Sequence, residues 1–262
     1  MNDGIVTADC SPNVARRLAL ARELEETLTM TAPETVAALD EFLAPVQTPE
    51  ERPVVGLSLE LYRRKLAWVR DNLTAAEQRY VEGLARAAAL FTLRDALTVE
   101  LSKKLGNLQR TCRAWLAADD LRLLGFAART ARWPKPVLKQ SREVATGLER
   151  LDVEIDSPEW PKLKAWLRDQ ARALVPEITE LSRALADVEQ QRRRTKDDLA
   201  ARKEASEDFD RNYLAIGRVA EALLRMAGKD ADADRIHPST RQLDRKMDEE
   251  EVDAGSTDTW SS

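Results

Sequence analysis

The chain has 262 residues, of which 43% are hydrophobic and 33% charged, and its formal net charge is −5. Alanine, leucine, arginine and glutamate dominate, and only 9 glycines and 11 prolines interrupt them. Because these four residue types are strong helix formers, the composition predicts an all-α protein. No run of about 18 uncharged apolar residues occurs, which excludes a transmembrane helix within this sequence.

The beginning of the chain and its cysteines indicate a compartment. Residues 1–11 are acidic and lack the basic and apolar regions of a secretory signal, so we expect a flexible leader. Cys10 and Cys112 lie far apart without a Cys-x-x-Cys spacing, which favours free thiols over a disulfide. We therefore expect a cytoplasmic protein.

The first helix is expected over residues 12–44. Ser11 is a suitable N-cap and Pro12 fits the first turn, while Pro33 predicts a break. Three prolines and a glycine within residues 45–57 predict a loop.

A long second helix is expected over residues 58–117. Thr74 and Glu77 match a capping box, which leaves open a new helix start inside it. A shorter helix over 119–131 follows, and the two prolines in 133–136 predict a break before a helix over 136–152.

The last helix is expected over residues 158–228, kinked or divided at Pro176 and ended by Gly228. Apolar residues repeat every three or four positions over 178–188 and again over 209–223, as in a coiled coil. Between these seams, 12 of the 20 residues in 189–208 are charged and cannot anchor a core. We expect that stretch to project beyond its partners or to form the solvated tip of a helical hairpin.

These elements predict an elongated antiparallel helical bundle over 12–228, with a sub-boundary near 132–136 left open. Residues 229–262 are polar and acidic, and we expect a mostly disordered tail there. Four tryptophans are expected in helix contacts and Trp133 in a packed loop; the four are Trp68, Trp115, Trp160 and Trp166.

The sequence offers little for catalysis. Its single histidine, His237, lies beside a proline in the expected tail, where nothing would position it as a base. A Glu-x-x-His pair, a Cys/His zinc set, a glycine-rich phosphate loop and an EF-hand loop are all missing from the sequence. We therefore predict no catalytic, cofactor-binding or metal-binding residues and a non-enzymatic protein.

Charge is distributed unevenly along the chain. Residues 61–146 hold 17 basic and 8 acidic residues, a net charge of +9 within an acidic protein. Either these charges pair with acidic neighbours at helix rims, or they form a basic face for nucleic acid backbone or an acidic membrane surface. The candidate basic face comprises Arg63, Arg64, Lys65, Arg70, Lys103, Lys104, Arg110 and Arg113.

Trp260 is a lone aromatic residue in an acidic segment, a pattern typical of short anchors that bind a partner groove. The leading hypothesis is a helical interaction or scaffold protein that binds a protein partner or self-associates through the seams 178–188 and 209–223. The alternative is an anion-binding helical module that uses the basic 61–146 segment, although no nucleic-acid-binding motif is present.

Overall fold

The computed structural model describes residues 10–44 and 53–236. The expectations for residues 1–9 of the leader, for His237 and for Trp260 lie outside the described residues.

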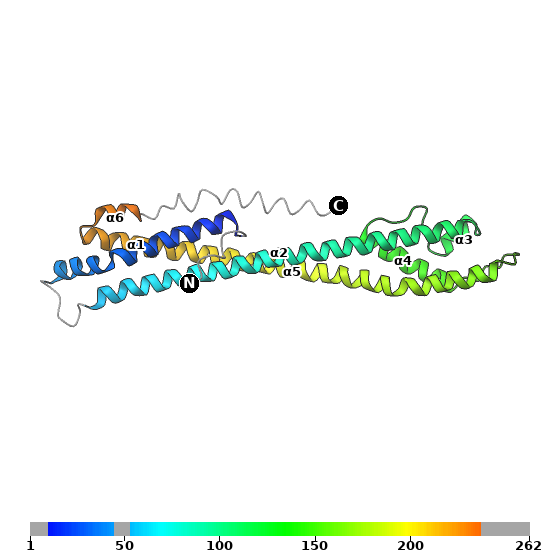
Figure 1. Cartoon of the computed structure of the whole chain (residues 1–262), viewed down its shortest axis with the longest axis horizontal. Coiled ribbons are helices and arrows are strands. Elements are labelled where there is room, and N and C mark those ends of the chain that lie inside the picture. Colours follow the sequence, from blue (N-terminus) through cyan, green and yellow to red (C-terminus); the bar gives the residue numbers. More distant parts are fainter. Residues whose placement is uncertain (1–9, 45–52, 237–262) are drawn as a thin grey trace. The chain divides into compact units, whose positions relative to one another are not determined.

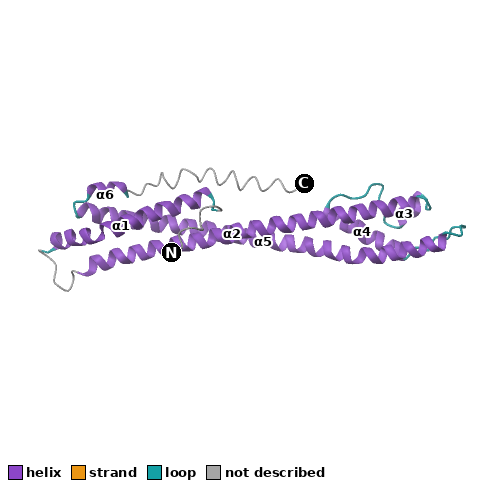
Figure 2. Cartoon of the chain, in the orientation of Figure 1, coloured by secondary structure: helices purple, strands orange, loops and turns teal. Residues whose placement is uncertain are grey.

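The described residues are almost entirely helical and contain no strand, which confirms the all-α prediction (Figure 2). The long helices pack against each other as in a helical bundle. Six helices occur in these ranges, and Figure 1 labels them: α1 (Pro12–Leu43), α2 (Pro53–Arg113), α3 (Ala118–Leu123), α4 (Pro134–Glu149), α5 (Trp160–Met226) and α6 (Asp230–Arg235).

The chain divides into two compact units, and α2 and α5 contribute to both. Unit 1 contains the described residues up to Glu82 and those from Asp197 onward. Unit 2 is Gly83–Lys196. The division therefore cuts the two long helices, and the sub-boundary considered near 132–136 lies inside unit 2.

In unit 1, α1 lies beside α2 and α5 (Figure 1). Arg70 of α2 bonds to Glu25 of α1, and Arg17 of α1 donates to both carboxylate oxygens of Asp210 on α5, each at 2.8 Å. The core takes buried residues from all three helices: Val14, Leu18, Ala21, Leu24, Leu28, Leu59, Leu66, Val69, Leu73, Phe209, Tyr213, Ile216, Ala220 and Leu224.

Helix α6 belongs to this core. Ala233 and Ile236 are buried in it, and Arg225 near the end of α5 pairs with Asp234 at 2.7 Å. Gly228, at φ +70°, provides the turn between α5 and α6, because a side chain is disfavoured in that left-handed conformation. The packed part of the chain therefore extends to residue 236, beyond the predicted start of the tail at 229.

In unit 2, α4 and α3 pack against α2 and α5. Trp160 at the start of α5 is 1% exposed, and its indole Nε1 donates to the Val153 carbonyl at 2.9 Å. The core includes, among others, Leu101, Leu105, Leu108 and Cys112 of α2, Val137, Val144 and Leu148 of α4, and Leu167, Leu174 and Leu181 of α5.

Three helix boundaries differ from those expected. Helix α1 continues through Pro33, because Leu28 and Leu39 are buried on both sides of the proline and packing holds the helix. Helix α4 includes both Pro134 and Pro136, which fall in the first turn, where backbone N–H groups have no intrahelical partner. The loop expected over 45–57 ends earlier, since α2 begins at Pro53.

Two further predictions fail for local reasons. Thr74 does not start a helix: α2 runs through it, and its hydroxyl donates to the Arg70 carbonyl one turn earlier at 2.9 Å. The helix expected over 119–131 ends at Leu123, because Gly125 at φ +87° turns the chain against α4.

That turn depends on Gly147 of α4. A Cβ built on Gly147 would lie 2.6 Å from the Leu124 carbonyl oxygen, a backbone atom that cannot easily move. At Gly106 of α2 the nearest atom is the Thr130 hydroxyl at 3.7 Å, an ordinary contact. Gly147 therefore has no room for a side chain, whereas Gly106 does.

Gly147→Ala is expected to lower the free energy of unfolding by about 2 kcal/mol, because the added methyl overpacks a backbone contact. Gly106→Ala, the matched control, should be neutral or raise it by up to about 1 kcal/mol through helix propensity. Urea unfolding followed by far-UV circular dichroism measures both. Equal effects of the two substitutions would contradict the close approach at Gly147.

Candidate functional site

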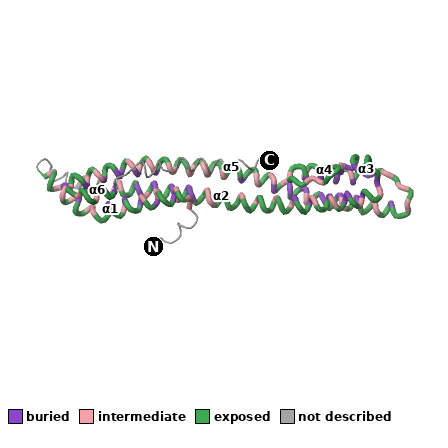
Figure 3. The backbone as a smooth tube through the Cα atoms, turned by 90° about the horizontal axis from the view of Figure 1, so that it is seen from above, coloured by how far each residue is buried: buried purple, intermediate pink, exposed green. Residues whose placement is uncertain are grey.

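A stretch of α2 in unit 2 carries apolar residues that no other described element of this unit covers. The buried residues of the unit 2 core begin on α2 at Leu101, and the exposed apolar residues precede it. In Figure 3 the tube of α2 beside its label is drawn mostly in the green of exposed residues. Leu84 is 45% exposed, Phe91 39% and Val99 50%. These values are high for large apolar side chains on a helix that is well packed a few turns later.

Small and uncharged residues surround these three. We call the uncovered face the exposed set Leu84, Ala85, Ala88, Ala89, Phe91, Thr92, Ala96 and Val99. At 100° per residue they share one broad side of the helix, and Asp95 is the only charge among them. From 84 to 99 the face is about 22 Å long at 1.5 Å per residue.

The opposite side of α2 contacts α5. The Gln191 side chain is buried, and its Nε2 donates to the Gly83 carbonyl at 3.2 Å. On α5, Arg192, Arg193 and Arg194 follow and are all exposed. At Gly83 α5 therefore meets α2 through a polar contact, on the side of α2 away from the uncovered face.

The two apolar seams predicted for self-association are occupied within the chain. Ile178 and Leu181 are buried in the unit 2 core, and Phe209, Tyr213 and Ile216 in the unit 1 core. The charged stretch between them is continuous helix within α5, so it is not the tip of a hairpin. Any surface available to a partner must therefore lie elsewhere.

The candidate basic face is divided between the two units. Arg63, Arg64, Lys65 and Arg70 lie in unit 1, whereas Lys103, Lys104, Arg110 and Arg113 lie in unit 2. Within each unit, the four basic residues lie near one another along α2.

Most of these cations already have partners. In unit 1, Arg63 and Arg64 both pair with Glu60 at 2.8 Å. Hydrogen bonds from these two guanidinium groups, Arg63 first, lower the pKa of the Glu60 carboxyl from 4.5 to about 2. In unit 2, Lys104 pairs with Glu177, and Arg113 donates to the Ala128 carbonyl at 3.2 Å. These contacts agree better with basic residues that pair with their neighbours than with a face open to a bound anion.

The tryptophans divide into buried and exposed sets. Trp160 is buried, and its ring centroid lies 6.5 Å from that of the half-buried Trp115. Trp166 is 41% exposed, Trp68 55% and Trp133 68%, so the expected core role of Trp68 and the packed-loop role of Trp133 are not observed.

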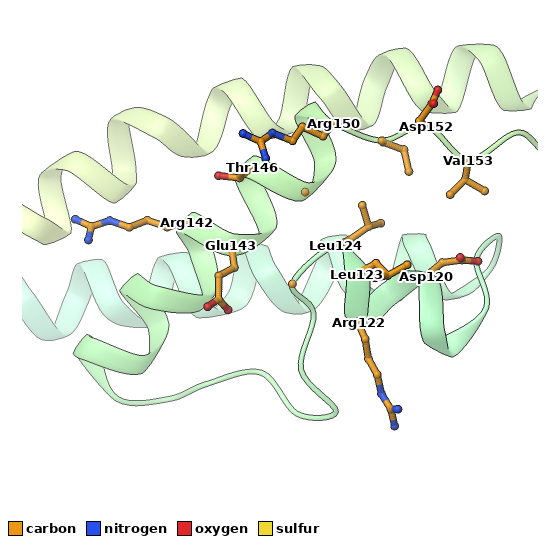
Figure 4. A pocket seen from close by; sticks show the side chains of 13 residues that line it. Asp120, Arg122, Leu123, Leu124, Arg142, Glu143, Thr146, Arg150, Asp152 and Val153 are labelled. Atoms are coloured by element: carbon orange, nitrogen blue, oxygen red, sulfur yellow. The ribbon is translucent and has the colours of Figure 1, made fainter.

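A groove of about 810 Å³ lies in unit 2 beside α3 and α4 (Figure 4). Arg122, Arg142 and Arg150 line it together with Asp120, Glu143 and Asp152. The labelled charged side chains point in different directions, and Arg142 donates to the Ser182 hydroxyl at 3.1 Å. The groove therefore has balanced charge and no base directed at a nucleophile.

Glu77 of α2 was missed as a distinctive residue by sequence reasoning. It is 1% exposed, accepts the Ser11 backbone N–H at 2.6 Å, and lies 3.5 Å from the Arg202 guanidinium. Arg202 in turn lies over the Tyr80 ring, 4.6 Å from its centroid. Through these contacts Glu77 joins the start of α1 to α2 and α5. We interpret Glu77 and Arg202 as a structural pair.

Comparison with family models, curated proteins and solved structures found no match for this chain. Among the described helices, none is long and apolar enough to cross a membrane. In the same ranges, no group of three or more His, Cys, Asp or Glu side chains could hold a metal ion. Neither Cys10 nor Cys112 forms a disulfide among the described residues, and burial raises the pKa of Cys112 to about 11.

Glu77→Gln is expected to lower the free energy of unfolding by about 3 kcal/mol, because it leaves the mostly buried Arg202 charge without its carboxylate. Glu204→Gln, on an exposed position of α5, is the matched control and should change it by less than about 0.5 kcal/mol. Urea denaturation measures both. If Glu77→Gln proved as mild as the control, the pair would not stabilise unit 1.

Proposed function

We propose that this chain is a non-enzymatic helical interaction protein that self-associates through the uncovered face of α2. The observation that carries the proposal is an exposed, almost uncharged helix face in a protein with 33% charged residues. Exposed contiguous apolar surface of this kind typically marks an interaction site.

The residue pattern of the face favours a helix as the bound element. Small side chains let two helix backbones approach closely, and Ala85, Ala88, Ala89 and Ala96 give the middle of the face that character. Leu84 and Phe91 at one edge add larger apolar area. A helical partner would bury one charge with this face, the carboxylate of Asp95, which pairs with Arg94 at 2.7 Å.

The pattern is also self-complementary. An antiparallel pair with Thr92 on the two-fold axis would place Ala88 opposite Ala96 of the second copy and Ala85 opposite Val99 of the second copy. These layers are uncharged, and the same register sets Ala89 opposite Asp95. Each contact occurs twice, as in an isologous interface. A second copy of the chain is therefore the partner that the face fits without further assumptions.

Anion binding has less support. In both units most of the predicted basic residues are engaged by carboxylates or carbonyl oxygens. A bound anion would have to compete with these contacts, whereas a helix on the uncovered face would displace only water.

Size-exclusion chromatography with light scattering, over a range of concentrations, tests the proposal. The unchanged chain is expected to show a concentration-dependent dimer. Ala88→Glu places a carboxylate inside the helix pair and should raise the dimer Kd at least about tenfold, a cost of about 1.4 kcal/mol. Circular dichroism should be unchanged, because Ala88 is exposed.

Ala186→Glu is the matched control, since Ala186 is an exposed alanine of α5 in the same unit. It should leave the dimer intact. A chain lacking residues 237–262 should also dimerise, because it retains α6 and both cores. A monomer at every concentration would contradict the proposal. Equal effects of Ala88→Glu and Ala186→Glu on the dimer Kd would contradict it as well.

A further inference from the structure

A second exposed face of α2 lies in unit 1 and differs from the first in carrying positive charge. Leu57 is 60% exposed, Leu61 52% and Trp68 55%. With Arg64 they are spaced by four, three and four residues, so they follow one line along the helix. We call these four residues and Lys65 the basic-apolar face.

Cations outnumber carboxylates on this face. Arg64 and Lys65 lie on it, and Glu60, the neighbouring carboxylate, is shared between Arg64 and Arg63. The Lys65 ammonium lies 4.1 Å from the centroid of the Trp68 ring, so the aromatic surface and the positive charge are adjacent. A ligand that suits this face combines carboxylates with an apolar side chain.

The chain itself contains such a segment. Residues 248–258 include six carboxylates and no lysine or arginine, and Trp260 follows them. The described chain ends at Ile236, which is buried in the same unit as the basic-apolar face. Eleven residues lie between Ile236 and Asp248, and this stretch can span up to about 40 Å.

We propose that residues 248–260 bind the basic-apolar face of their own chain. The carboxylates of 248–253 pair with Arg64 and Lys65, and Trp260 covers the apolar surface formed by Leu57, Leu61 and Trp68. The face is about 16 Å long between residues 57 and 68, well within reach of the segment. The covalent link holds the segment at an effective concentration in the millimolar range, which favours it over an unlinked anion.

Zero-length carbodiimide cross-linking of the full chain, read by mass spectrometry, tests the proposal. The reagent joins a lysine amine to a carboxylate in direct contact. Links from Lys65 to residues 248–253 are expected at least about fivefold more often than links from Lys103. Lys103 is the matched control, because it is an exposed lysine of the same helix in unit 2.

Trp260→Ala keeps all six carboxylates and should reduce the Lys65 links about threefold or more. Trp68→Ala should do the same, and its exposed position leaves the core intact. A mixture of ¹⁵N-labelled and unlabelled chains shows whether each link lies within one chain. Equal links at Lys65 and Lys103 would overturn the proposal, and so would links that join only different chains.

Discussion

The charge of α5 between residues 189 and 208 is the constraint on which the rest of the structure depends. Twelve of these twenty residues are charged, yet the helix continues through them without a break. A helix this polar offers little apolar surface to a neighbour, and its buried contacts are polar ones such as Gln191 to Gly83 and Arg202 to Glu77. The apolar residues of α5 therefore gather on either side of this stretch, and the chain builds two cores instead of one.

The surface of α2 follows from the way α5 runs beside it. Helix α5 is antiparallel to α2, with Glu177 at Lys104 and Gln191 at Gly83, and its residues Leu181 and Ala184 between them are buried. Helix α5 therefore contacts one side of residues 84–99 and leaves the side with apolar and small residues exposed. Leu84, Phe91 and Val99 remain exposed as a result, and we interpret them as the part of a helix seam that a second chain completes.

The sequence predicted where helices lie better than it predicted which of their faces are covered. Ser11 and Gly228 predicted the ends of helices correctly, because capping depends on the residue type at a single position. The sequence predicted a long helix over 58–117, and the structure shows that its apolar residues Leu84 and Phe91 are exposed. Periodicity identifies the apolar side of a helix but does not say whether another element covers it.

Other errors came from contacts between residues far apart in the chain. The Thr74 and Glu77 spacing resembles a helix start, whereas Glu77 in fact bonds to Ser11 and Arg202. The early end of α3 depends on how closely Gly125 and Gly147 let two segments approach.

The central claim is that a second chain covers residues 84–99 of α2. Amide hydrogen exchange of that segment, measured by mass spectrometry at low and high protein concentration, tests it most directly. The account predicts slower exchange of 84–99 at high concentration, while peptides from the already packed residues 101–112 keep their rates. Exchange of 84–99 that is fast and independent of concentration would contradict it.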